Sequence, residues 1–74
     1  MTVKSLILIE GSSVTKASLG ISLTSALHVV IGRSPAMGWI VHVAANSSAD
    51  LGKALLKFAQ VPNVTGVVTL MIRN

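Results

Sequence analysis

Side chains that could take part in chemistry are few in this 74-residue chain, and they are spread apart. Glu10 and Asp50 are the only carboxylates, and they fall in different segments, which disfavours acid–base catalysis by a pair. The serine pairs at 12–13 and 47–48 have no Asp–His pair to activate them, so we interpret them as helix caps. We therefore expect a protein with no enzymatic activity and no cofactor.

The two histidines, His28 and His42, are predicted to share one face of a sheet, on neighbouring strands of a hairpin. A metal site would need a third ligand, and the sequence offers no cysteine and no carboxylate near them. We interpret both as amphipathic side chains on a partly exposed sheet, and expect no metal. The lack of cysteine also fits a reducing compartment.

The composition predicts a surface that something else must cover. Hydrophobic residues make up 51% of the chain and charged residues only 11%, with a mean hydropathy of +0.77. A chain of this length builds one small core, so we expect a single domain over residues 1–74. So much apolar surface in so small a domain predicts an exposed apolar patch, and with it oligomerisation or partner binding.

Six Lys and Arg residues against two acidic residues give a net charge of +4. A basic balance favours nucleic acid as a partner, because neutralised phosphates supply much of such affinity. The cations are scattered along the chain, however, and Trp39 and Phe58 are its only aromatic side chains. Nucleic acid is therefore not the partner we expect.

Apolar runs in the chain are short, and the longest, such as residues 6–9, fall far below the roughly 18 residues that a spanning helix needs. The N-terminal residues do not show the apolar stretch and cleavage motif of a secretory signal. We expect no membrane span and a cytoplasmic location.

The first half of the chain predicts three strands and one helix. Residues 3–9 are rich in aliphatic side chains and indicate a strand. Residues 14–26 are interpreted as a helix, although their Ser, Thr and Gly content lowers helix propensity and Leu19, Ile21 and Leu23 alternate as in a strand. Residues 27–31 and 39–44 are two β-branched runs, and the exposed loop 33–37 between them predicts a hairpin.

The second half predicts a helix followed by a strand. Ser47 and Asp50 have the spacing of a helix-capping box with a shorter acid. An apolar stripe follows at helical spacing, formed by Leu51, Ala54, Leu55 and Phe58. Pro62 prevents continuation of the helix, and residues 64–72 indicate the last strand.

The element order is strand, helix, strand, strand, helix, strand. Two right-handed crossovers of this kind place both helices on the same face of an antiparallel sheet. We therefore predict an α+β fold, a ferredoxin-like βαββαβ open-faced sandwich with a four-stranded antiparallel sheet and two helices on one face.

Alternation along the predicted strands divides their residues between the two faces. The helix-covered face is expected to hold Ser5, Ile7, Ile9, Val29, Ile31, Trp39, Val41, Val43, Val68, Leu70 and Ile72. The other face is expected to hold Lys4, Leu6, Leu8, Glu10, His28, Val30, Ile40, His42, Ala44, Val67, Thr69, Met71 and Arg73. A register error of one residue would exchange the faces of a strand.

The face without helices has an aliphatic centre and a charged rim formed by Lys4, Glu10 and Arg73. A protein interface or a docked peptide requires this pattern. A homodimer that packs sheet against sheet would explain it equally well, and the sequence leaves both open.

Three stretches resemble the NapD family of small cytoplasmic chaperones, which bind the twin-arginine signal peptide of the periplasmic nitrate reductase. They are residues 4–9 (KSLILI), 38–43 (GWIVHV) and 61–67 (VPNVTGV). The resemblance implies a signal peptide as ligand, and we place the contact surface on the helix-free face, at Leu6, Leu8, Ile40, His42 and Met71. Because the ligand is basic and the chain carries +4, apolar contact would have to supply the affinity.

A similar Pro-x-Val turn into a last strand occurs in the effector domains of Lrp/AsnC regulators and in ACT domains. This second resemblance implies an alternative function, a stand-alone dimeric module that senses a small ligand between subunits or that serves oligomerisation.

Overall fold

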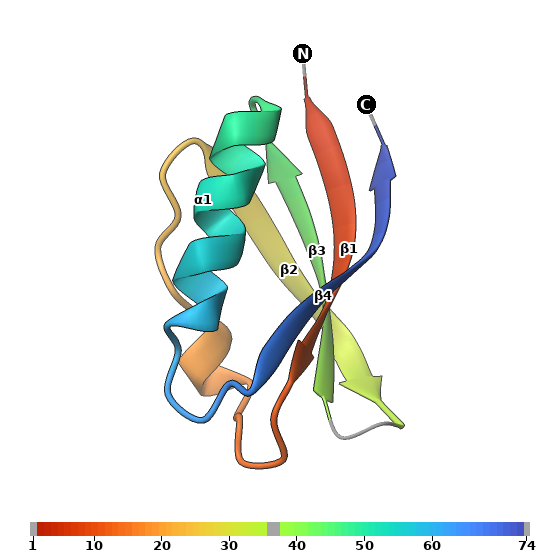
Figure 1. Ribbon diagram of the computed structural model, residues 1–74, viewed down its shortest axis with the longest axis vertical. Helices are drawn as coiled ribbons and strands as arrows, with labels where there is room; N and C mark the ends of the chain where they lie inside the picture. The colour runs from red at the N-terminus through yellow and green to blue at the C-terminus, as the bar shows by residue number, and fades with distance from the viewer. Residues whose placement is uncertain (1, 36–37, 74) are drawn as a thin grey trace.

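A computed structural model describes residues 2–35 and 38–73 (Figure 1). These residues form four strands, β1 (Val3–Glu10), β2 (Ala26–Ser34), β3 (Gly38–Ala45) and β4 (Gly66–Arg73). The strands make one sheet, which is antiparallel throughout and has the order β2-β3-β1-β4. The helix α1 (Ser48–Ala59) crosses one face of the sheet, and Figure 1 shows this face alone covered. The hairpin predicted between the second and third strands is confirmed, although Ala36 and Met37 of its loop lie outside the described residues.

The helix predicted over residues 14–26 is wrong, so the described residues form one α-helix where the sequence predicted two. This segment forms only a 3₁₀ turn, Ala17–Leu19, and its other residues are irregular up to Ala26, where β2 begins. Gly20 follows the turn, and Ser25 has a φ of 59°, outside the helical range. The Ser, Thr and Gly residues of this segment favour local turns over a continuous helix, which explains the outcome.

The irregular segment still covers part of the sheet, because its apolar side chains are buried and its backbone is bonded to strand side chains. Val14 and Leu19 lie in the core. Trp39 Nε1 donates to the carbonyl oxygen of Val14 over 2.8 Å, and the Nε2 of His28 lies 2.8 Å from the carbonyl oxygen of Leu19. These side-chain bonds satisfy carbonyl groups that a helix would have satisfied internally.

The predicted helix after Ser47 is confirmed in position and in its buried stripe. The Ser47 hydroxyl accepts a hydrogen bond from the amide of Asp50 over 3.1 Å, as an N-cap does. The Asp50 carboxylate accepts from the same hydroxyl over 3.0 Å instead of reaching the Ser47 amide, so the capping box is incomplete. Leu51, Ala54 and Phe58 are buried, and burial of a side chain as large as Phe58 contributes about 1.5–3 kcal/mol.

Two bulges change which face several strand residues occupy. In β4 the register passes from Leu6↔Met71 to Ile7↔Thr69, so Leu70 is an extra residue. In β2 the register passes from Val30↔Val41 to Gly32↔Ile40, so Ile31 is an extra residue. Residues opposite each other on paired strands share a face of the sheet. One extra residue therefore exchanges the faces of all the residues that follow it in the strand.

The face assignments are therefore right for β1 and β3 and partly wrong for the two edge strands. Val29 pairs with His42 on the side away from α1, and Val68 pairs with Leu8 there, although both were predicted under the helices. His28, Val30, Val67 and Thr69 were predicted on the uncovered side, and their register partners place them on the side of α1. Ile31 and Leu70, predicted under the helices, are the exposed bulge residues.

No helix among the described residues is long and apolar enough to cross a membrane.

We predict that Ser47→Ala lowers the free energy of unfolding by about 1 kcal/mol, because the first turn of α1 loses its cap. Ser48→Ala is the matched control, since this neighbour lies inside the helix and is exposed, and we expect a change within about 0.5 kcal/mol. Urea denaturation followed by circular dichroism measures both. Equal effects of the two substitutions would contradict the capping role.

Candidate protein-binding face

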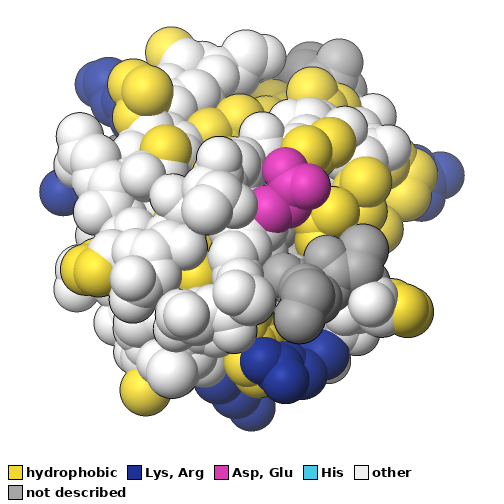
Figure 2. Space-filling view, turned by 60° about the horizontal axis from the view of Figure 1, so that its bottom comes forward, with side chains coloured by type: hydrophobic (Ala, Val, Ile, Leu, Met, Phe, Trp, Pro, Cys, Tyr) yellow, Lys and Arg dark blue, Asp and Glu magenta, His cyan; other side chains and the backbone are white. Residues whose placement is uncertain are grey.

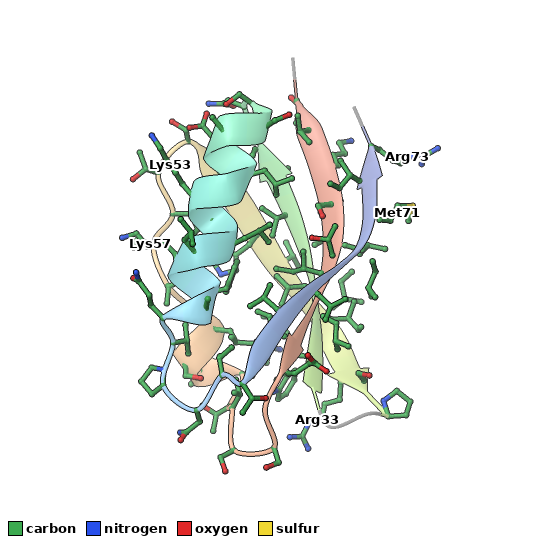
Figure 3. All side chains as sticks on the ribbon, in the orientation of Figure 1. Arg33, Lys53, Lys57, Met71 and Arg73 are labelled. Atoms are coloured by element: carbon green, nitrogen blue, oxygen red, sulfur yellow. The ribbon has the colours of Figure 1, made fainter. Side chains whose placement is uncertain are left out.

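The side of the sheet opposite α1 has no covering element among the described residues, and we call it the open face. Its members come from all four strands and are Lys4, Leu6, Leu8, Glu10, Leu27, Val29, Gly32, Ser34, Gly38, Ile40, His42, Ala44, Gly66, Val68, Met71 and Arg73. Figure 3 shows Met71 and Arg73 on this side, directed away from α1.

Register pairs arrange the open face in rows that run across the strands. One central row consists of Met71, Leu6, His42 and Val29, and the other of Val68, Leu8, Ile40 and Gly32. The five residues predicted from the sequence as the contact surface, Leu6, Leu8, Ile40, His42 and Met71, all lie in these two rows. The fold therefore brings the whole predicted set together in one continuous patch.

The patch extends beyond the predicted set into both edge strands. The exposed fractions are 78% for Leu27, 64% for Val29 and 42% for Val68. Unbroken alternation along the predicted strands had placed Val29 and Val68 under the helices, and Leu27 had been assigned to neither face. The sequence of β2 alone does not show which side is buried, because Ala26, His28 and Val30 alternate with Leu27 and Val29 and both sets contain apolar side chains.

Charged residues stand at the two opposite ends of the open face. Lys4 and Arg73 are register partners at one end, and Glu10 lies at the other, between Gly66 and Gly38. A side chain at Gly66 would collide with the Glu10 carboxyl group, which therefore lies over β4. In Figure 2 hydrophobic side chains lie beside the acidic group visible in that view, and Lys and Arg side chains appear at the margins. Cations and the lone carboxylate are thus separated along the strands.

A shallow hollow of about 320 Å³ lies at the cationic end. It is lined by Lys4, Ser5, Leu6, His42, Met71 and Arg73. The buried Ser5 hydroxyl donates to the carbonyl oxygen of Met71 over 2.9 Å, next to the β4 bulge. This bond fixes the bulged backbone, and the bulge in turn places Met71 on the open face.

His28 and His42 do not lie on the same face, so their predicted arrangement is wrong. His28 lies under α1, where its ring meets the Phe58 ring edge to face with centroids 5.2 Å apart, and its Nε2 donates to the Leu19 carbonyl. Only His42 is on the open face. Within residues 2–35 and 38–73, no group of three His, Cys, Asp or Glu side chains could hold a metal ion.

Trp39 belongs to the core side of the sheet, as predicted. It packs against the buried cluster and donates to Val14, and the Arg33 guanidinium lies 4.8 Å from the centre of its ring. The ring is therefore in contact with other residues of the same chain, including a cation.

A second hollow, of about 250 Å³, lies on the far side of the molecule between α1 and the irregular segment. Leu23, Ala54 and Leu56 line it together with Lys53 and Lys57. Figure 3 shows both lysine side chains directed away from the sheet. Lysines in this position are typical of the solvated side of a helix, near the end that favours positive charge.

In comparisons with known proteins, no family model, no curated protein and no solved structure matched this chain. The geometry of the open face is therefore the observation from which a function can be inferred.

We predict that His28→Thr lowers the free energy of unfolding by about 1–2 kcal/mol, because it removes the bond to Leu19 and the ring contact with Phe58. Val29→Thr is the matched control on the next residue, and its effect should stay within about 0.5 kcal/mol because Val29 is exposed. Urea titrations in dilute protein measure both. A larger loss for Val29→Thr would mean that the faces of β2 are reversed.

Proposed function

We propose that this chain is a small non-enzymatic protein-binding module whose open face takes up an apolar segment of another protein. The observation that carries the proposal is the uncovered apolar centre of the sheet, built from the two central rows of four strands. Contiguous apolar patches of this kind on small proteins mark interaction surfaces, because leaving them in water costs free energy.

The shape and chemistry of the patch favour an extended peptide. Strands of a sheet present shallow grooves between rows of side chains, and Met71 adds a flexible thioether at the edge of the hollow. β4 is an edge strand, so a bound peptide can also approach its outer backbone groups. Apolar side chains of the peptide would then occupy the centre, and its polar groups would meet the rim.

We further propose a cytoplasmic chaperone that resembles the NapD family, with the hydrophobic region of a twin-arginine signal peptide as the bound segment. The fold would then be a ferredoxin-like sandwich whose first crossover has shortened to the 3₁₀ turn Ala17–Leu19. Lys4 and Arg73 at the rim repel the paired arginines of such a peptide, so its binding energy must come from the apolar rows.

We predict that Ile40→Asp weakens binding of a twin-arginine signal peptide at least tenfold, because it places a charge in the middle of an apolar contact. Leu56→Asp is the matched control, since Leu56 is 65% exposed on α1 and lies away from the open face. Fluorescence anisotropy of a labelled peptide gives the affinities, and circular dichroism verifies that both variants fold. An unchanged affinity for Ile40→Asp would contradict the proposal.

Two altered peptides separate apolar from electrostatic recognition. Replacing the leucines of the hydrophobic region by serine should abolish binding to the wild-type chain, whereas replacing the arginine pair by lysine should leave the affinity within about threefold, as expected where apolar burial dominates. Loss of binding with the lysine peptide and retention with the serine peptide would show that the open face is not the recognition surface.

A further inference from the structure

The open face is complementary to itself when one copy is turned end over end above another. A two-fold axis lying in the interface and running across the strands sets each strand over the same strand of the partner, in the opposite direction. The central row that contains Leu6 then meets the row that contains Leu8, and the row of Lys4 meets the row of Glu10.

At three positions on the edge strands this arrangement sets a larger side chain of one copy over a small residue of the other, while on the inner strands Leu6 meets Leu8 and His42 meets Ile40. Val29 meets Gly32, where a side chain would find open space, and Arg73 meets Gly66. Leu27 of one end row meets the position of Ser34 in the other. Matching of this kind allows two flat sheets to approach to the roughly 10 Å spacing of packed sheets.

The same rotation brings oppositely charged side chains of the two copies together. Lys4 and Arg73 of one copy come to the end where the Glu10 carboxyl of the other lies over β4, and the reciprocal contact forms at the opposite end. An axis along the strands would instead gather four cations at one end and leave both carboxylates at the other. Sheets that pack face to face cross at about 30°, a displacement that side chains as long as Lys, Arg and Glu can span.

The area is sufficient for such a pair. Four strands about 4.8 Å apart, each about eight residues long at about 3.3 Å per residue, present a flat area of roughly 500 Å². Two copies then bury about 1,000 Å² or more, which reaches the lower limit of specific interfaces. The buried part is roughly a ninth of the 4492 Å² surface of one chain, close to the usual share for a small protein.

We propose that a second copy of this chain covers the open face, in a two-fold dimer whose axis runs across the strands and whose ends are joined by Glu10 with Lys4 and Arg73 of the partner. This inference rests on the open face being a binding surface, as proposed above, and adds a means of regulation. Dimerisation and uptake of an apolar peptide compete for the same residues, so free peptide-binding surface appears only when the dimer dissociates.

The test uses two charge-reversal variants, Glu10→Lys and the double variant Lys4→Glu/Arg73→Glu. Each alone places like charges together at both ends of the dimer, and each should raise the dimer dissociation constant at least tenfold. Mixed in equal amounts they should form a heterodimer, because every contact then joins opposite charges. Sedimentation velocity with one variant fluorescently labelled measures the homodimers and the heterodimer.

The double variant Lys53→Glu/Lys57→Glu is the matched control, because it makes the same change of net charge on the outer side of α1. We expect it to dimerise as the wild type does. A wild-type chain that remains monomeric up to millimolar concentration overturns the inference, as does a mixture that forms no heterodimer although circular dichroism shows both variants folded.

The proposed dimer and the proposed peptide-binding function can be contradicted independently of each other. A monomeric wild-type chain that binds the signal peptide would overturn the dimer and leave the proposed function in place. A dimer with charge-reversal rescue that binds no peptide at any dilution would overturn the function and leave the dimer. If both hold, the Glu10→Lys monomer should bind the peptide more tightly than the wild-type chain measured at the same concentration.

Discussion

Packing of α1 and of the irregular segment 11–25 against a single side of the sheet is the interaction on which the rest of the structure depends. The core lies between these elements and the strands, where Ile7, Ile9, Val41 and Val43 meet Leu19 and Phe58. The described residues supply no comparable element for the other side of the sheet. Both sides nevertheless carry aliphatic side chains, so folding of the described residues buries one apolar surface and leaves the second exposed to solvent.

Polar side chains hold the covering layer where regular structure is absent. Trp39 and His28 reach from the strands to the carbonyl groups of Val14 and Leu19, and the Ser47 hydroxyl caps α1. Each of these bonds satisfies a backbone group in or near the core that would otherwise lose its hydrogen bond on leaving water. A segment rich in Ser, Thr and Gly can therefore take the place of a helix while the carbonyl groups of Val14 and Leu19 keep hydrogen-bond partners.

Much of the fold follows from local sequence. The aliphatic run of β1, the alternation of β3 and the apolar stripe of α1 each predict an element type and a buried side, because the inner strands and the helix are in direct contact with the core. The cap at Ser47 was also readable from the spacing to Asp50. Four of the five predicted contact residues, Leu6, Leu8, Ile40 and His42, lie on β1 and β3.

The edge strands and the irregular segment were beyond such reasoning for a physical reason. A strand with one neighbour is only partly covered, so burial places few constraints on which of its residues are hydrophobic. In β2, Leu27 and Val29 are exposed, whereas Ala26 and His28 face the core. The bulges at Ile31 and Leu70 depend on pairing between strands distant in sequence. The 3₁₀ turn depends on partners supplied by Trp39 and His28, far along the chain.

The bulges at Ile31 and Leu70 fall in β2 and β4, the two strands that form the margins of the sheet. An extra residue breaks the even spacing of outward N–H and C=O groups and increases the local twist, so a foreign strand cannot align along the full margin. Open-ended stacking of copies into filaments is thereby disfavoured. The two margins of so hydrophobic a sheet are in this way less open to growth by added strands.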